Sequence, residues 1–136
     1  MLYMKYLMDT HTLLWFLFSP ANLSTDVTVI LGNKKNELNV SIVTFWEIAT
    51  KVKIGRLTLS GLSLSDIKNE CKKLKIHILP ISFNNILKYL SLPLFKNHKD
   101  PFDRMLIATS INDSLPLLSC DSKLPQYVNS GLKYIW

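Results

Sequence analysis

Short apolar runs alternate with longer helical patterns along this chain. Apolar runs bounded by turn residues predict buried strands, and they cover residues 2–8, 38–42, 76–81, 115–119 and 133–136. Apolar residues at helical spacing predict helices at residues 10–18, 24–32, 44–54, 65–75, 83–90 and 101–112. Strands that alternate with helices predict an α/β fold, in which helices cover both faces of a central parallel sheet.

Length and composition favour one folded domain. The 136-residue chain is 48% apolar and 19% charged, which excludes a disordered protein. Cys71 and Cys120 have no metal-binding or redox spacing, as expected of reduced thiols in the cytoplasm. The apolar run 13–18 is too short to span a bilayer, and Asp9 interrupts any secretory signal. We therefore expect a single cytoplasmic domain, residues 1–136, with no membrane partner.

Acidic residues gather at one predicted edge of the sheet. They lie where a strand ends or where a nearby helix begins, and they are Asp9, Glu47, Asp100, Asp103 and Asp121. Ligands of parallel α/β sheets bind outside the carboxyl ends of the strands, so these acids are expected to converge. Carboxylates that converge repel one another, and a hard divalent cation such as Mg²⁺ or Mn²⁺ removes the conflict. We predict a metal site made by Asp9, Glu47, Asp103 and Asp121, with Asp100 as an additional nearby acid.

Each acid also has an ordinary structural interpretation. Asp100 fits the N-cap of the helix that follows it, and capping is its favoured role. Asp9 and Asp121 suit turns, and Glu47 can pair with Lys51 one helical turn later. Local structure explains each acid singly, but it explains the whole set less well.

The charge balance suggests a polyanionic partner. The formal net charge is +6, and without the four proposed ligands the rest of the chain carries +10. A solvated, lysine-rich surface is an equally good interpretation of charge alone. Basic residues near the proposed ligands are candidates for binding RNA phosphates, and these are Lys51, Lys53, Arg56, Lys99 and Arg104. Lys51 and Arg104 could instead only neutralise the acids.

Two hydroxyl residues and two histidines complete the predicted site. Thr10 and Ser119 adjoin Asp9 and Asp121 and are expected to orient carboxylates through hydrogen bonds. His11 and His98 lie close to the same acids. A lone histidine is more often a hydrogen-bonding partner than a ligand, so both stay outside the predicted catalytic set.

The ordered segments that carry these acids resemble the PIN-domain nucleases, and among them the VapC-type toxins of type II toxin–antitoxin systems. The resemblance covers nearly the whole chain and rests on segments 6–10, 40–55 and 98–108. It implies a three-layer α/β/α sandwich and Mg²⁺- or Mn²⁺-dependent cleavage of RNA, with Asp9, Glu47, Asp103 and Asp121 as catalytic and metal-binding acids. It also implies a cognate antitoxin in the groove and a homodimer. Around the last acid the chain departs from the family, because Ser119 stands for the usual Thr and Leu124 for Phe.

The sequence therefore predicts an endoribonuclease toxin that hydrolyses RNA phosphodiester bonds with metal-activated water. The main alternative is a non-catalytic PIN-like binding module whose acidic pocket holds a basic partner peptide. A receiver-like phosphoacceptor ranks lower, because Asp9 has no acidic neighbour in its own segment. A phosphatase with a second Asp two residues after the first is disfavoured, because that position is His11.

Overall fold

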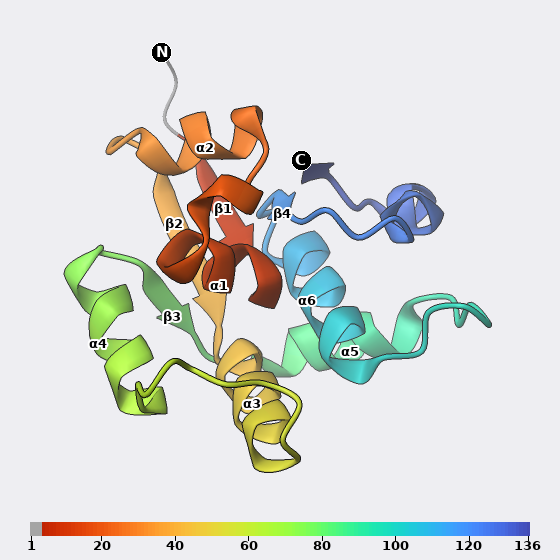
Figure 1. The fold of residues 1–136 in the computed structure, drawn as a ribbon. Helices are drawn as coiled ribbons and strands as arrows, with labels where there is room; N and C mark the ends of the chain where they lie inside the picture. Colours follow the sequence, from red (N-terminus) through yellow and green to blue (C-terminus); the bar gives the residue numbers. More distant parts are fainter. Residues whose placement is uncertain (1–3) are drawn as a thin grey trace.

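A parallel sheet forms the centre of the computed structural model, which describes residues 4–136 (Figure 1). Within this part of the chain five parallel strands lie in the order β3-β2-β1-β4-β5. The strands are β1 (Lys5–Met8), β2 (Glu37–Ser41), β3 (His77–Leu79), β4 (Leu117–Leu118) and β5 (Tyr134–Ile135). All five predicted strands are thus found; β2 is shifted by one residue from the prediction, and the other four are shorter than predicted. Residues 2 and 3 of the first prediction lie outside the described part.

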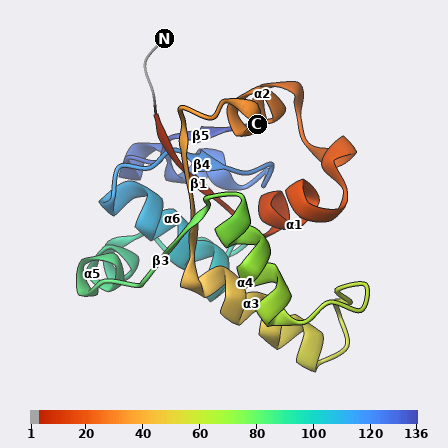
Figure 2. The same cartoon turned by 90° about the vertical axis from the view of Figure 1, so that its left-hand side faces the viewer.

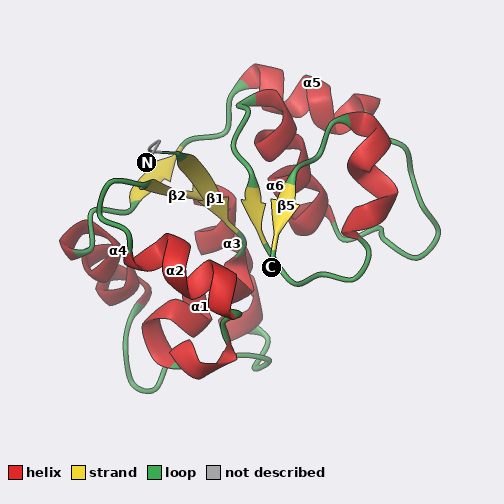
Figure 3. Cartoon of the chain, turned by 90° about the horizontal axis from the view of Figure 1, so that it is seen from above, coloured by secondary structure: helices red, strands yellow, loops and turns green. Residues whose placement is uncertain are grey.

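Helices cover both faces of the sheet, which confirms the predicted three-layer α/β/α sandwich (Figures 2 and 3). Helices α1, α2 and α4 form the layer on one face of the sheet, and α5 and α6 form the layer on the other face. Helix α3 follows β2 and lies below the sheet in the view of Figure 1. The helices are α1 (Thr10–Phe18), α2 (Thr25–Gly32), α3 (Ile42–Lys53), α4 (Leu64–Lys73), α5 (Phe83–Ser91) and α6 (Pro101–Asn112). Two 3-10 helices, η1 (Pro20–Asn22) and η2 (Leu124–Ser130), were not predicted.

The sheet divides the hydrophobic core into two clusters. Successive side chains of a strand point to opposite faces, so Tyr6 and Met8 pack with Leu13 of α1, whereas Leu7 packs with Ile107 of α6. Leu7 and Met8 are completely buried. Burial of each such side chain contributes about 1.5–3 kcal/mol. The first strand is therefore the point at which both layers are anchored.

Side-chain caps decide where several helices begin. The Ser41 hydroxyl accepts a hydrogen bond from the backbone N–H of Val43, so α3 begins at Ile42, two residues earlier than predicted. The Ser63 hydroxyl and the Asp66 carboxylate form a reciprocal capping box at the start of α4. Short polar side chains stabilise helix starts because they satisfy backbone N–H groups that have no partner inside the helix.

The chain direction places a crevice at the middle of the sheet. From β1 the strand order runs outward through β2 to β3, and it then resumes on the other side of β1 with β4 and β5. Such a reversal opens a ligand-binding crevice at the carboxyl ends of the two strands beside it. Here these strands are β1 and β4, which Asp9 and Asp121 follow.

None of the helices in residues 4–136 combines the length and the apolar character needed to cross a membrane.

Candidate metal centre

Asp9 lies at the end of β1 and caps α1. Its Oδ1 accepts a hydrogen bond of 2.8 Å from the backbone N–H of Thr12, and the Thr12 hydroxyl donates to the backbone oxygen of Leu118 in β4. Burial raises the pKa of the Asp9 carboxyl above its usual range, although hydrogen bonds from Ser119 and Thr12 oppose the shift. The local turn predicted for Asp9 is thus present, and it aims the carboxylate into the crevice.

Glu47 is a buried acid with two partners. It lies on α3 and is only 2% exposed. Its Oε1 accepts a 2.6 Å hydrogen bond from the Thr10 hydroxyl, and its Oε2 lies 2.6 Å from Nζ of Lys51. An unpaired carboxylate at this depth would be strongly unfavourable. The hydrogen bond and the ion pair hold Glu47 in one orientation at the bottom of the site.

Asp100 and Asp103 lie at the start of α6 and have different roles. Oδ1 of Asp100 accepts hydrogen bonds from the backbone N–H groups of Phe102 and Asp103, so Asp100 is the N-cap of the helix. The Asp103 side chain remains 40% exposed. Its pKa is raised to about 7, first by burial and then by the negative charges of Asp100, Glu47, Asp121 and Asp9. The negative charge of every other acid in the predicted set therefore contributes to the raised pKa of Asp103.

His98 lies between the last two acids. Its Nε2 is 3.1 Å from Oδ2 of Asp121 and 3.8 Å from Oδ2 of Asp103. Within residues 4–136, His98, Asp103 and Asp121 are the group whose potential ligand atoms all lie within 4.8 Å of one another. The sequence prediction keeps His98 outside the catalytic set, and the sequence signal for it is its position two residues before Asp100.

The predicted acids share one cleft of about 530 Å³. It is lined by all five of them, namely Asp9, Glu47, Asp100, Asp103 and Asp121. Oxygen donors from separate segments, with raised pKa values at Asp9 and Asp103, are the donor set that Mg²⁺ or Mn²⁺ prefers. These residues therefore fit a divalent cation, and a cation here would relieve their mutual repulsion.

Four of the five basic residues predicted near the site separate into three groups. Lys51 and Lys99 line the acidic cleft, and Arg56 lines a neighbouring groove of about 510 Å³ that also contains Lys51 and Trp15. Lys53 is exposed and lines neither of them.

Arg104 corrects one of these predictions. Its side chain is buried, and its Nη1 donates hydrogen bonds to the backbone oxygen of Pro93, at 2.8 Å, and to the Tyr127 hydroxyl, at 3.3 Å. The guanidinium also lies over the ring of Tyr89. A group that is buried and occupied in this way does not reach an RNA phosphate.

Thr10 and Ser119 form hydrogen bonds with carboxylates of the site, as the sequence predicts. The Thr10 hydroxyl contacts Glu47 and Thr44, as well as linking α1 to α3. The Ser119 hydroxyl hydrogen-bonds to the Asp9 carboxylate and accepts a hydrogen bond of 3.2 Å from the backbone N–H of Asp121. Ser119 therefore connects the acids at the ends of β1 and β4.

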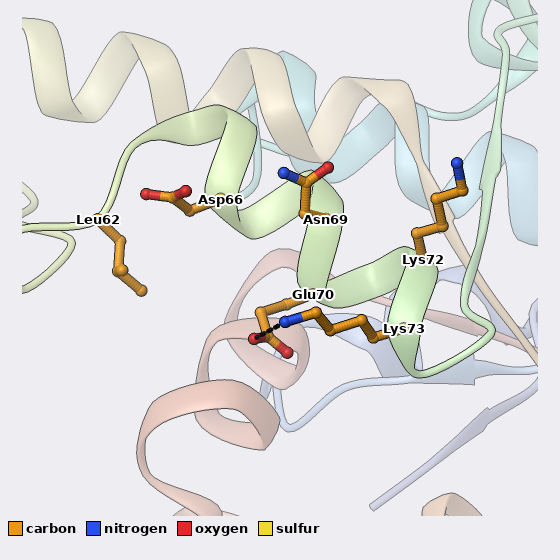
Figure 4. A pocket seen from close by; sticks show the side chains of 6 residues that line it. All are labelled: Leu62, Asp66, Asn69, Glu70, Lys72 and Lys73. Atoms are coloured by element: carbon orange, nitrogen blue, oxygen red, sulfur yellow. Dashed lines mark ion pairs between the residues drawn. The ribbon is translucent and has the colours of Figure 1, made fainter.

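A second hollow of about 600 Å³ lies along α4, away from these acids (Figure 4). Its charged groups come from one helix and are used locally. Asp66 belongs to the capping box, and hydrogen bonds with Ser63 lower the pKa of its carboxyl. Glu70 forms an ion pair of 3.7 Å with Lys73. The hollow brings together no residues from separate segments and offers no comparable site.

The fold and the cleft define a parallel α/β protein whose acids meet at the switch point of its sheet. A family model described as PIN domain matches residues 6–129, and the chain belongs to the PIN domain family. No curated protein sequence matches it.

Solved structures of toxin–antitoxin complexes share this fold. VapBC2 from Rickettsia felis, bound to a DNA fragment from its promoter, matches with a TM-score of 0.63 and 12% identity over 96% of this chain and 97% of the other. VapBC-1 from nontypeable Haemophilus influenzae matches with a TM-score of 0.62 and 17% identity over 96% of both chains. DNA-bound VapBC from Salmonella typhimurium matches with a TM-score of 0.55 and 13% identity over 99% of this chain and 98% of the other. At these identities the likeness establishes the shared fold.

Proposed function

We propose that this protein is a divalent-metal-dependent endoribonuclease and the VapC-type toxin of a type II toxin–antitoxin pair in the cytoplasm. The observation that carries the proposal is the meeting of Asp9, Glu47, Asp103 and Asp121, from four separate segments, in one cleft of a PIN domain. The raised pKa of Asp103, caused in part by the other three, supports their grouping around a shared cation.

The four acids would hold Mg²⁺ or Mn²⁺. When bound, such an ion lowers the pKa of water and neutralises charge that develops on a phosphodiester. Thr10 and Ser119 orient Glu47 and Asp9 for this task, as their hydrogen bonds suggest. Lys99 and Lys123 at the cleft are suited to hold the flanking phosphates of a single RNA strand. RNA thus meets a basic rim around an acidic centre.

The proposed partner is an antitoxin protein. The solved structures that share the fold of this chain include VapBC toxin–antitoxin proteins, which supports this partner. An antitoxin segment that occupied the acidic cleft would exclude RNA and silence the enzyme. Because the cleft is acidic, we expect the inserted segment to carry Arg or Lys.

The apolar face of α5 supports the proposed homodimer. Its exposed side chains follow helical spacing at Phe83, Ile86, Leu87 and Leu90, and the last is 80% exposed. Two copies of a chain with a net charge of +6 repel one another, and an uncharged contact face adds least to this repulsion. An apolar stripe without charges is self-complementary across a twofold axis, so a second copy is the occupant that fits it.

RNA cleavage by the purified chain tests the enzymatic proposal. We expect cleavage with Mg²⁺ or Mn²⁺, loss of cleavage in EDTA, and at least a 100-fold reduction in Asp9→Asn and Asp103→Asn. Asp26→Asn on the exposed first turn of α2 is the matched control and should cleave normally. Cleavage at the wild-type rate by both well-folded cleft variants would refute the mechanism.

The second candidate is a non-catalytic module that binds a basic peptide. The ion pair between Lys51 and Glu47 favours this candidate, because it places an ammonium group inside the cleft. Titration with Mn²⁺ separates the two functions. The enzyme binds Mn²⁺ with an affinity that falls in Asp9→Asn, whereas a peptide-binding pocket has no need of the ion.

A further inference from the structure

A buried chain of side chains runs from Arg104 to the acid Asp121. Nη1 of Arg104 lies 3.3 Å from the Tyr127 hydroxyl, which lies 2.7 Å from Nδ1 of His98. Nε2 of the same ring lies 3.1 Å from Oδ2 of Asp121. Arg104, Tyr127 and His98 are all buried. The two hydrogen bonds of the Tyr127 hydroxyl are therefore shielded from water, whereas the last bond reaches the partly exposed carboxylate of Asp121.

The hydrogen bonds from Arg104 to Asp121 all run in one donor-to-acceptor direction, because Arg104 can only donate. A guanidinium carries N–H donors and no acceptor, so the Tyr127 oxygen accepts from Arg104. The Tyr127 hydroxyl then has its own hydrogen to donate, and Nδ1 of His98 is the acceptor beside it. Nδ1 must be unprotonated to accept, which leaves the proton of a neutral imidazole on Nε2. That N–H donates to the carboxylate of Asp121.

The other tautomer of His98 leaves a buried group without a partner. With a proton on Nδ1, the Tyr127 oxygen would receive donors from both His98 and Arg104. Its own hydrogen would then have no acceptor among the hydrogen-bond partners that Tyr127 has within residues 4–136, which are His98 and Arg104. A buried hydroxyl without an acceptor is unfavourable. The Nε2–H form satisfies every member of the chain.

We propose that Arg104 and Tyr127 fix His98 as a donor that positions Asp121, so that His98 is a positioning residue and not a metal ligand. This inference rests on the proposed function, because Asp121 matters as one of the acids that hold the cation. A ligand would need a lone pair at Nε2, the atom that here carries the proton. Hydrogen bonds of this kind, one step behind a ligand, orient it and typically change metal affinity by about 10- to 100-fold.

These hydrogen bonds leave the carboxylate of Asp121 little rotational freedom. Oδ2 accepts from His98, and Oδ1 accepts a 2.9 Å hydrogen bond from the backbone N–H of Lys123. Both oxygens are thus held before any cation arrives, and each keeps a further lone pair. Nε2 of His98 is also 3.8 Å from Oδ2 of Asp103, so the His98 ring lies between the carboxylates of Asp103 and Asp121.

The first experiment records the tautomer of His98 in the metal-free protein by nitrogen–proton NMR of the imidazole rings. His98→Gln identifies the signals of this residue among the three histidines. We expect an unprotonated Nδ1 and a protonated Nε2 in wild type, and a mixture of tautomers in Tyr127→Phe. A wild-type ring protonated at Nδ1 overturns the proposal. This readout needs neither metal nor RNA, so it stands even if the proposed function fails.

The second experiment measures Mn²⁺ affinity by titration. Tyr127→Phe should bind Mn²⁺ about ten-fold more weakly, and His98→Ala should lose at least as much. His98→Gln should recover part of the loss, because its amide nitrogen reaches roughly the place of Nε2. Tyr89→Phe removes a hydroxyl from the other aromatic ring beside Arg104 and is the matched control. It should bind Mn²⁺ as wild type does.

The outcomes separate the two proposals. Wild-type Mn²⁺ affinity in Tyr127→Phe and His98→Ala contradicts the positioning role, even if both wild type and variants cleave RNA. Nitrogen coupling from His98 in the electron spin resonance of bound Mn²⁺ identifies it as a ligand and also refutes the proposal. No Mn²⁺ binding by wild type refutes the metal site and the role of His98 in it, whereas the tautomer remains a separate result.

Discussion

Nζ of Lys51 lies 2.6 Å from Oε2 of Glu47, a carboxylate with 2% of its surface exposed. In the proposed enzyme a cation would share this carboxylate, so Lys51 supplies positive charge when the cation is absent. Lys51→Met should destabilise the metal-free protein by about 1–2 kcal/mol, less than a fully buried pair because Lys51 is 34% exposed. Saturating Mn²⁺ should remove much of the difference. Urea denaturation with Mn²⁺ and with EDTA measures both values.

Lys53→Met provides the control for this prediction. Lys53 lies on the same helix, is exposed and forms none of the ion pairs found in residues 4–136. Its substitution should change the free energy of unfolding by less than about 0.5 kcal/mol, with or without Mn²⁺. Equal effects at the two lysines would mean that Lys51 does not compensate the buried charge.

The Thr10 hydroxyl is expected to matter more than its size suggests. Thr10→Val keeps the shape of the side chain but removes the donor to Oε1 of Glu47. Leaving a buried carboxylate oxygen without this partner should cost about 1–3 kcal/mol of stability. The affinity for Mn²⁺ should fall about ten-fold, because Glu47 is less well oriented. Thr10→Ser retains the hydroxyl, and calorimetry of both variants should place it close to wild type.

The raised pKa of Asp103 predicts an unusual pH dependence in EDTA. Its ordinary value is 3.8 and its folded value is about 7, so the folded state binds more protons than the unfolded state between these values. Asp103 therefore makes the protein less stable as pH rises from about 4 to about 7. Asp103→Asn should remove this slope and be more stable than wild type at pH 8 by a larger margin than at pH 5. Denaturant melts at the two pH values measure the margin.

Asp26→Asn is the reference for the pH experiment. Asp26 is an exposed acid in the first turn of α2, outside the acidic cleft. Its variant should follow the wild-type pH profile. A parallel profile for Asp103→Asn as well would show that the acids of the cleft do not interact in the metal-free protein.

The exposed stripe on α5 predicts a concentration-dependent dimer. Leu90→Glu places a charge in the apolar contact, where it would be buried without a partner. We expect the variant to be monomeric by light scattering at concentrations where wild type dimerises, with an unchanged melting temperature for the monomer. Val29→Glu changes an apolar residue of α2 that is also exposed and should leave the dimer intact. Dimers of unchanged stability in Leu90→Glu would exclude this face.

The parts of the fold that depend on neighbouring residues could be predicted from the sequence. Asp100 caps α6 as expected, because Asp before Pro at a helix start satisfies two backbone N–H groups. The strand predicted at residues 76–81 is found as β3, which ends at Leu79, just before Pro80, and lies at one end of the sheet. The 3-10 helix Leu124–Ser130 was missed, because three residues per turn leave little periodic signal in so short a segment.

The roles of His98 and Arg104 could not be predicted in the same way. Arg104 lies one residue after Asp103, so sequence reasoning placed its charge near the cleft and made it a phosphate-binding candidate. Successive residues of a helix point in different directions, and here the guanidinium turns inward to Pro93 and Tyr127. Tyr127 gave no signal at all, since it is 29 positions from His98 and acts through one hydroxyl.

By itself, the sequence determined the alternation of strands and helices, the parallel sheet and the acids that follow its strands, because periodicity, capping and strand ends are local properties. Only the tertiary structure decided that β1 and β4 are neighbours, that Glu47 is buried against Thr10, and that His98 contacts Asp121. These contacts join residues far apart in the chain. Their existence depends on how two layers of helices pack on one sheet, which no local pattern encodes.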